Sequence, residues 1–185
     1  MIIEPTPLSG MVLIKPDVFG DARGYFLESW NRRRYAEAGL DVEFVQDNQS
    51  LSRRGILRGL HFQNPHPQGK LVQVLLGEVF DVAVDIRLGS PTFGQWYGTV
   101  LSEANHHQLY VPEGFAHGFC VTSETALFAY KCTDFYDPAG EFSIRWDDPE
   151  LGIEWPIEAP LLSAKDQAGR LLKDIPRESL PAWRA

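Results

Sequence analysis

The hydrophobic pattern along the chain is that of short β-strands separated by turns. The clearest case is a hairpin in which residues 70–76 and 79–87 flank the turn Gly77-Glu78. Side chains alternate between the two faces of a strand, so the second arm of this hairpin has two different surfaces. One surface is apolar and the other polar, with Phe80, Val82, Val84 and Ile86 on the first and Asp81, Asp85 and Arg87 on the second.

Strand patterns recur along the rest of the chain, whereas helical patterns are scarce. The 16 glycines and 13 prolines are spread over most of the sequence, as turns between short strands require. We expect further strands at residues 10–14, 24–30, 42–48, 56–63, 96–102, 107–111, 116–122 and 126–136. Two short helices are expected, one over residues 31–38, closed by Gly39, and one over residues 164–173.

Many strands with only peripheral helix predict an all-β fold, a double-sheet jelly roll with a few short helices. The length of 185 residues suits a single domain over residues 1–185, because it can bury one core and is short for two. Small ligands commonly bind at the mouth or in the interior of such folds, so we expect the functional site there.

Charge and composition disfavour several classes of function. A formal net charge of −8 opposes binding to nucleic acids and to anionic membranes, since both depend on a broad basic surface. A small anionic ligand would need a local basic pocket, and Arg23 and Arg58, each next to a glycine, are the best candidates to bind its phosphate. The chain shows no signal peptide and no membrane-spanning apolar run, so we expect a cytoplasmic protein. Cys120 and Cys132 are then expected to be reduced, buried and non-catalytic.

His61, a histidine in a predicted strand, is the first candidate for chemistry. Such a histidine is more often a half-buried structural residue than a catalyst. Arg58 lies three positions earlier, and an odd spacing directs two side chains to opposite faces of a regular strand. A bulge at Gly59 would bring both to one face, because an extra residue changes the alternation. Without that bulge, only one of the two lines the pocket.

Two segments resemble the conserved stretches of the cupin superfamily. Residues 71–85 resemble the first stretch, and residues 111–119, VPEGFAHGF, resemble the second. Metal-binding cupins carry a His-x-His pair and a glutamate on the first hairpin, where this chain has only Val-Gln-Val at residues 72–74. His106 and His107 are adjacent, so in a strand they point to opposite faces and are poorly placed to chelate one ion. The resemblance supports the fold, and we expect no metal.

Tyr130 and Asp166 each admit a structural and a chemical interpretation. Tyr130 shares a strand face with Phe128, as an amphipathic tyrosine in a barrel wall does. Ser163 and Asp166 match the Ser-x-x-Asp form of a capping box, in which Asp166 is structural. Alternatively, Asp166 is the carboxylate that orients His61 and stabilises its protonated form. The spacing alone does not decide between these interpretations.

Five stretches of the chain, in order, resemble those of the dTDP-4-dehydrorhamnose 3,5-epimerase family. They are DARGYFLE at residues 21–28, QDNQS at 46–50, LRGLHFQ at 57–63, PEGFAHGF at 112–119 and LSAKD at 162–166. The resemblance implies a metal-free, cofactor-free isomerase with a cupin jelly roll. The implied reaction inverts C3 and C5 of dTDP-4-dehydro-6-deoxy-D-glucose to give dTDP-4-dehydro-L-rhamnose. It belongs to dTDP-rhamnose biosynthesis, which serves lipopolysaccharide and other cell-surface carbohydrates.

The same resemblance assigns roles to individual residues. It implies that His61 is the general base, helped by Asp166, and that Tyr130 is the general acid on the other face of the sugar. Lys70 lies where the family stabilises the enolate oxygen. The family is homodimeric, with N-terminal residues that reach the neighbouring subunit's site. The implied substrate-binding residues are Arg23, Phe26, Glu28, Gln46, Asn48, Arg58, His117, Phe119, Glu141 and Lys165, of which Arg23, Phe26 and Glu28 are expected to act across the interface.

Three alternatives remain open. A related enzyme would invert C3 alone or C5 alone with the same histidine, aspartate and tyrosine. A non-catalytic jelly roll that binds a nucleotide sugar would not need His61 and Tyr130 together with Asp166 and Lys70. A metal-dependent cupin enzyme is the third alternative, and it lacks the expected ligands.

Overall fold

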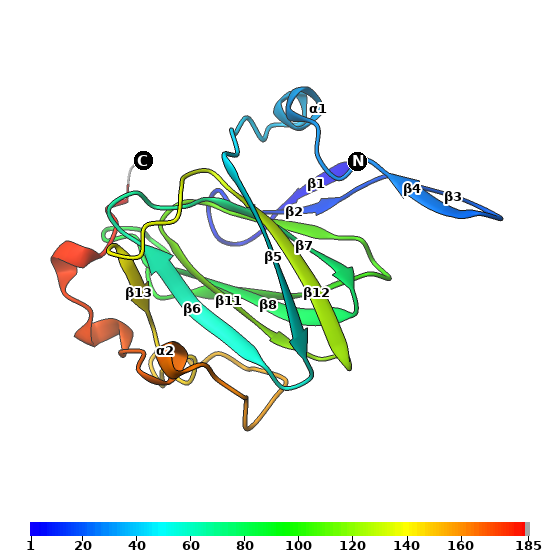
Figure 1. The fold of residues 1–185 in the computed structure, drawn as a ribbon. Coiled ribbons are helices and arrows are strands. Elements are labelled where there is room, and N and C mark those ends of the chain that lie inside the picture. Colours follow the sequence, from blue (N-terminus) through cyan, green and yellow to red (C-terminus); the bar gives the residue numbers. More distant parts are fainter. Residues whose placement is uncertain (184–185) are drawn as a thin grey trace.

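The structure of the chain, a computed structural model that describes residues 1–183, consists of two facing sheets and a projecting hairpin (Figure 1). The first sheet has six strands in the order β1 (Ile2–Pro5), β2 (Val12–Lys15), β10 (Gln108–Val111), β7 (Lys70–Leu76), β12 (Thr125–Cys132) and β5 (Gln46–Arg53). The second has five strands in the order β13 (Glu141–Ser143), β6 (Leu57–Gln63), β11 (Phe115–Val121), β8 (Glu78–Asp85) and β9 (Trp96–Ser102). Two antiparallel sheets face to face make the double-sheet jelly roll that the sequence predicts.

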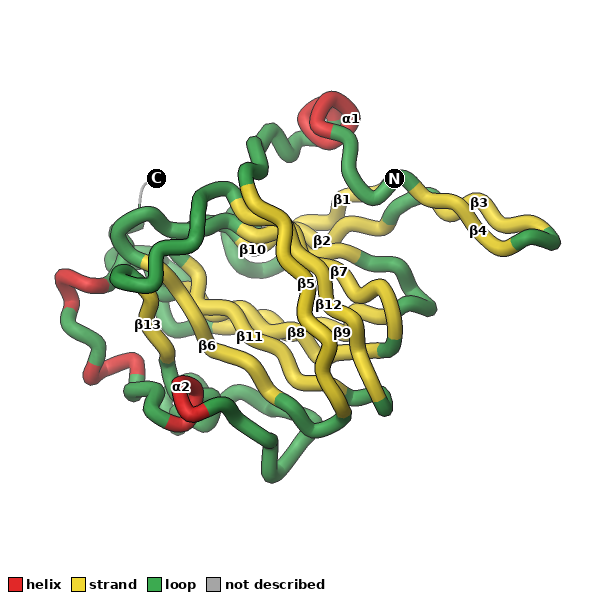
Figure 2. Tube along the Cα trace, viewed as in Figure 1, coloured by secondary structure: helices red, strands yellow, loops and turns green. Residues whose placement is uncertain are grey.

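A hairpin and short helices lie outside the two sheets (Figure 2). β3 (Val18–Asp21) and β4 (Gly24–Leu27) pair with each other in a separate two-stranded sheet that extends away from the body. α1 (Arg32–Glu37) is capped by Asn31, and the C-terminal segment carries α2 (Ala164–Gln167) with two 3-10 helices, Leu172–Asp174 and Arg177–Ser179. Within residues 1–183, no helix is long and apolar enough to cross a membrane.

The five-stranded sheet is covered on both faces. Its inner face meets the six-stranded sheet in the main core, which includes Ala83 of β8 and Phe128 of β12. Its outer face packs against the C-terminal segment through side chains such as Val82, Val84 and Leu172. The apolar surface predicted for β8 therefore lies beneath the C-terminal segment, and its polar alternate residue Asp81 points between the sheets.

Most of the predicted strands are present with shifted ends. Residues 70–76 and 96–102 coincide with β7 and β9, whereas the strand predicted over residues 42–48 begins four residues later, as β5. β1, β3 and β13 were not predicted, because these short segments show little alternation of apolar and polar residues.

The single helix predicted over residues 164–173 is wrong. α2 ends at Gln167, and the chain then pairs with the end of β13 and the residues after it, where Arg170 N–H donates to the Ser143 carbonyl at 3.1 Å. The Arg170 carbonyl in turn accepts from Arg145 N–H at 2.8 Å. These backbone hydrogen bonds to a distant segment replace those that a longer helix would make.

Candidate active site

One cavity between the two sheets, here called the main cavity, brings together most of the predicted site residues. Its volume is about 410 Å³, and strands of both sheets, α2 and two loops contribute to its lining. The predicted residues in that lining are Gln46, Asn48, Arg58, His61, Lys70, His117, Phe119, Tyr130, Glu141, Lys165 and Asp166.

His61 and Asp166 form a hydrogen-bonded pair in the wall of this cavity. The distance from His61 Nε2 to Asp166 Oδ1 is 2.5 Å, and Asp166 is only 3% exposed. Burial alone would raise the pKa of Asp166, but the hydrogen bonds from His61 and Ser163 outweigh it and hold this pKa below its usual value. The pair therefore contains a carboxylate that keeps its charge next to an imidazole.

Ser163 connects this pair to the start of α2. The Ser163 hydroxyl accepts from the Asp166 backbone N–H at 3.1 Å, as an N-cap does, and it donates to Asp166 Oδ2 at 2.7 Å. The structural and the chemical interpretations of Asp166 are thus compatible. Its backbone is capped by Ser163, and its carboxylate is free to pair with His61.

A bulge in β6 turns Arg58 and His61 toward the same cavity. In the pairing with β11, His61 is opposite His117 and Arg58 is opposite Phe119, so β6 has one residue more than its partner. Gly59 has φ +122°, and a Cβ atom there would lie 2.5 Å from the Cα of Gly118. The bulge considered from the sequence is present, and two facing glycines make room for it.

Lys70 and Tyr130 come from the six-stranded sheet, on β7 and β12. Burial lowers the pKa of Lys70, although the charges of Cys132, Glu141 and Asp81 favour its ammonium form. Burial also raises the pKa of Tyr130, so its phenol holds its proton more firmly than a free tyrosine. Cys120 and Cys132 are buried free thiols, as the sequence predicts.

A second histidine–carboxylate pair borders the cavity. His117 Nε2 lies 2.9 Å and 3.0 Å from the two oxygens of Asp81, which is fully buried. The ring of Phe119 stacks on that of Phe128 at 4.1 Å between centroids, close to His117. Asp81 was not among the predicted site residues. Its position on the polar face of an otherwise apolar strand was the signal in the sequence that could have identified it.

At the rim of the main cavity, Glu141 is held by two neighbours. Its carboxylate accepts from Lys165 Nζ at 2.6 Å and from the Tyr136 hydroxyl at 2.8 Å. Burial raises the pKa of Glu141, and these two hydrogen bonds more than reverse that effect, so its pKa is below the usual value. Tyr136 N–H in turn donates to Gln46 Oε1 at 3.0 Å, which joins the rim to β5.

Several lining residues were missed from the sequence. Gln68 and Tyr136 lie in loops, where alternation gives no information on side-chain direction, and Tyr136 had been included in a longer β12. Ser50 lies inside the stretch that resembles the family, but its residue type alone gave no reason to single it out. The other missed lining residues are Gly118, Phe128 and Ser163.

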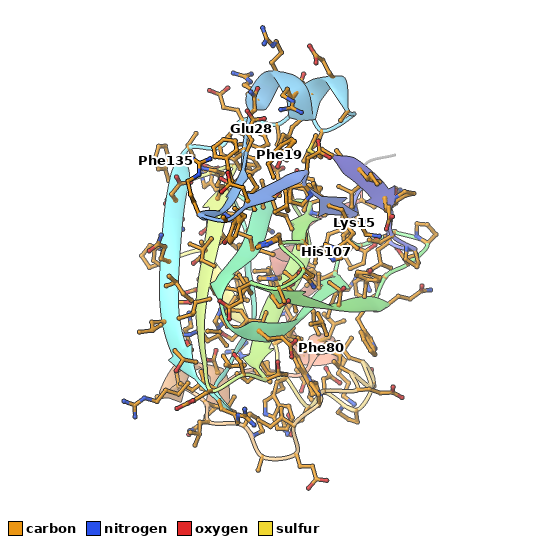
Figure 3. The ribbon with its side chains drawn as sticks, turned by 90° about the vertical axis from the view of Figure 1, so that its right-hand side faces the viewer. Lys15, Phe19, Glu28, Phe80, His107 and Phe135 are labelled. Atoms are coloured by element: carbon orange, nitrogen blue, oxygen red, sulfur yellow. The ribbon has the colours of Figure 1, made fainter. Side chains whose placement is uncertain are left out.

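Three predicted binding residues lie away from the main cavity of their own chain. Arg23 is at the tip of the β3–β4 hairpin, Phe26 is 69% exposed on β4, and Glu28 follows β4 and binds Arg34 of α1. Figure 3 shows Glu28 and Phe19 at the end of the molecule that carries α1, with Phe80 toward the other end. No residue of the arm formed by β3 and β4 lines the main cavity of its own chain.

No group of three or more His, Cys, Asp or Glu side chains converges in a way that would hold a metal ion within residues 1–183. The arrangement does offer acid–base groups of complementary kinds: an imidazole paired with a carboxylate, an ammonium and a phenol in one cavity. Such groups can remove, stabilise and return a proton on a bound molecule.

The sequence has close relatives in a family of nucleotide-sugar epimerases. Residues 5–174 match the family model described as dTDP-4-dehydrorhamnose 3,5-epimerase. A dTDP-4-dehydrorhamnose 3,5-epimerase of Pseudomonas aeruginosa is 59% identical over 166 residues, which are 89% of this chain and 92% of the relative. A dTDP-4-dehydrorhamnose 3-epimerase of Streptomyces niveus is 43% identical over 94% of this chain and 85% of the relative.

The fold has a close solved counterpart. The crystal structure of a dTDP-6-deoxy-D-glucose 3,5-epimerase from Legionella pneumophila, in complex with dTDP-4-keto-L-rhamnose, superimposes with a TM-score of 0.97. The two chains are 55% identical, and the match covers 100% of this chain and 99% of the other.

Proposed function

The chain belongs to the dTDP-4-dehydrorhamnose 3,5-epimerase family, and on that premise we propose that it is an isomerase acting on a dTDP-4-keto-6-deoxy sugar. It inverts C3 and C5 of dTDP-4-dehydro-6-deoxy-D-glucose to give dTDP-4-dehydro-L-rhamnose in dTDP-rhamnose biosynthesis. The observation that carries the proposal is the His61–Asp166 pair, which shares one cavity with Lys70 and Tyr130. These residues supply the base, the cation and the acid that proton exchange beside a ketone needs.

Removal of the proton beside the ketone is the difficult step. Such a C–H is about twelve pKa units less acidic than an imidazolium, so transfer to His61 alone is uphill by about 16 kcal/mol. His61 Nε2 donates to Asp166, which leaves Nδ1 as the ring nitrogen that takes the proton. Asp166 then stabilises the imidazolium, and the remaining stabilisation must act on the enolate oxygen.

We assign that stabilisation to Lys70. Its ammonium lies in a wall where burial reduces the screening by water, so its attraction to a developing negative charge is stronger than in solution. Removal of one such donor in other enzymes costs about 100-fold to 1000-fold in kcat. Lys70 thus stabilises the negative charge on the oxygen, while His61 removes the proton from the carbon.

Inversion requires that the new proton arrive from the face opposite the base, and we assign this step to Tyr130. Because burial raises the pKa of Tyr130, the phenol is protonated at neutral pH and ready to donate to the carbanion. Between the two inversions, Tyr130 recovers a proton from water and His61 releases its proton to water, which resets both groups. Repetition of the cycle at the second carbon gives the double epimerisation.

The other residues of the main cavity hold the nucleotide sugar in this proposal. Arg58 balances phosphate charge, since a guanidinium suits phosphate oxygens in charge and shape. The remaining contacts to the nucleotide, its diphosphate or the sugar are assigned to Gln46, Asn48, His117, Phe119, Glu141 and Lys165.

The active form in this proposal is a homodimer. The β3–β4 arm projects from the body and exposes aromatic side chains, with Phe19, Tyr25 and Phe26 each more than half exposed. Exposed apolar groups on a projecting arm are typical of a surface that another protein covers. The arm carries Arg23 and Phe26, and Glu28 follows it, so all three would reach the partner's main cavity.

We place the enzyme in the cytoplasm, where two free buried thiols remain reduced. There it would supply rhamnose precursor for cell-surface carbohydrates such as lipopolysaccharide. Its mechanism uses only protein side chains for proton transfer, with no cofactor or metal.

The proposal is tested by incubation of the protein with dTDP-4-dehydro-6-deoxy-D-glucose and assignment of the product by NMR. We expect a sugar inverted at both C3 and C5, formed equally well in the presence of a chelator. Inversion at C3 alone would match the activity named for the Streptomyces niveus relative. Tight binding without any turnover would contradict the enzymatic function, and activity lost on chelation would indicate a metal-dependent enzyme.

A further inference from the structure

One buried oxygen in the main cavity lacks a hydrogen-bond partner. Among the side chains of residues 1–183, Ser50 Oγ is the one buried nitrogen or oxygen atom without such a partner. Buried polar atoms in native proteins are nearly always hydrogen-bonded, because an unsatisfied one costs free energy. Ser50 lines the main cavity, so a bound molecule can supply the missing partner.

Ser50 shares the main cavity with a guanidinium that also has unused donors. β5 directs Ser50 and Ser52 to the same face, and Ser52 Oγ accepts from Arg58 Nε at 3.0 Å. Among the residues that the structure describes, the Arg58 guanidinium makes no other hydrogen bond, so both of its Nη groups are available. Ser52 thus orients Arg58, and the bulge at Gly59 keeps Arg58 on the cavity side.

The donors of Ser50 and Arg58 favour a ligand group that accepts hydrogen bonds. A guanidinium can only donate hydrogen bonds, and the Ser50 hydroxyl can donate one as well. Two donors in one cavity, one of them positively charged, fit a group that only accepts hydrogen bonds and is negatively charged, as a phosphate is. A nucleobase edge or a sugar hydroxyl, which also donates, would fit less well.

We propose that Ser50 binds the diphosphate of the nucleotide sugar, with its hydroxyl donating to a phosphate oxygen whose charge Arg58 balances. Ser52 is a positioning residue, which acts through Arg58. The proposal rests on the proposed function for the nature of the ligand, and it adds a binding residue to that site. In the free protein the hydroxyl is unsatisfied, and in the complex it gains a partner.

Because the Ser50 hydroxyl gains its partner only in the complex, substitution of Ser50 should change ligand affinity and leave the stability of the free protein unchanged. Ser50→Ala removes an oxygen that makes no hydrogen bond in the free protein, so the free energy of unfolding should not fall. A hydrogen bond to a charged group contributes about 1.5–3 kcal/mol, which is about 10-fold to 150-fold in affinity. A serine with a purely structural role would show the opposite pattern.

The test measures binding of dTDP by calorimetry and of thymidine by ligand-observed NMR, with melting temperatures for each variant. We expect Ser50→Ala to weaken dTDP binding about 10-fold or more, to leave thymidine binding unchanged and to melt no lower than the unmodified protein. Ser90→Ala is the matched control. The Ser90 hydroxyl donates to Asp85 Oδ2 at 2.6 Å outside the main cavity, so this variant should lose stability and keep its dTDP affinity.

Unchanged dTDP affinity in Ser50→Ala would overturn the proposal, and so would a parallel loss of thymidine affinity, since Ser50 would then act on the shape of the whole site. Failure of the proposed function is seen separately, in the unmodified protein, as an absence of epimerised product. The two failures are therefore distinguishable.

Discussion

The Asp166 carboxylate lies between a helix cap and a histidine. Its backbone N–H is satisfied by Ser163, so the side chain is available to His61. The sequence pointed to both interpretations and could not choose between them, since a capping motif and a histidine partner differ only in what lies nearby in space. The fold makes both contacts, because it brings α2 against β6, 105 positions earlier in the chain.

Substitution of these two residues should separate stability from catalysis. Asp166→Asn keeps the cap but loses the charge next to His61, so we expect kcat to fall by about 100-fold or more. Ser163→Ala loses the cap, and we expect the free energy of unfolding to fall by about 0.5–2 kcal/mol with a much smaller change in kcat. Steady-state kinetics and urea unfolding measure the two effects. Loss of stability in both variants without a selective rate loss in Asp166→Asn would mean that Asp166 is only structural.

The pKa of Lys70 predicts the alkaline limit of activity. Burial lowers this pKa below 10.5, so the ammonium to which we assign stabilisation of the enolate is lost as the pH rises through a value below that of a free lysine. The pKa of Tyr130 is raised above 10.0, so the acid keeps its proton in the same range. We expect kcat to decline on the alkaline side before pH 10.5, and Lys70→Met to lower kcat by about 100-fold. A profile that stays flat to that pH would argue against this role.

At the scale of the elements, alternation located most strands but left open whether β6 contains the bulge that assembles the cavity. Arg58 and His61 have the wrong parity for one face, and Gly59 was recognised as a possible bulge. The sequence could not show that Gly118, across the β6–β11 pair, provides the space that Gly59 needs. The helix predicted over residues 164–173 fails for a similar reason, because backbone pairing with residues after β13 is a long-range contact.

The bulge should be intolerant of any side chain at Gly59. Gly59→Ala places a Cβ atom 2.5 Å from Gly118 Cα and 2.8 Å from the His117 carbonyl oxygen at φ +122°. We expect a loss of more than about 3 kcal/mol in the free energy of unfolding. Gly89→Ala is the control, because Gly89 also has positive φ but no atom within 4 Å, and it should cost about 1–2 kcal/mol. Urea unfolding compares them, and equal losses would mean that the close approach to β11 is unimportant.

At the scale of the whole molecule, three predicted binding residues lie on or beside an arm that projects from the body of the chain. The sequence could assign Arg23, Phe26 and Glu28 to the substrate only through the family resemblance. No local pattern in one chain shows which surface an arm will meet. The geometry of the isolated chain agrees with an arm that acts elsewhere, since the arm forms its own two-stranded sheet.

Mixed dimers test whether the arm acts across the interface. We expect Arg23→Ala and His61→Asn proteins each to be nearly inactive and to regain activity when mixed and allowed to exchange subunits. In a mixed dimer, an intact arm then meets an intact His61 in one of the two sites, which gives about a quarter of all sites at equal amounts. Light scattering should report twice the 20.9 kDa of one chain. A monomer, or no recovery of activity on mixing, would contradict action across a dimer interface.

Exchange of the ring protons in heavy water tests the central claim most directly, since it detects proton removal beside the ketone whatever the product. The unmodified protein is incubated with dTDP-4-dehydro-6-deoxy-D-glucose in heavy water, and the C3 and C5 signals are followed by NMR. The account predicts that deuterium enters at both carbons, that His61→Asn abolishes this exchange, and that Tyr130→Phe keeps some exchange but inverts poorly. Absence of deuterium at both positions, with binding of the substrate established, would contradict it.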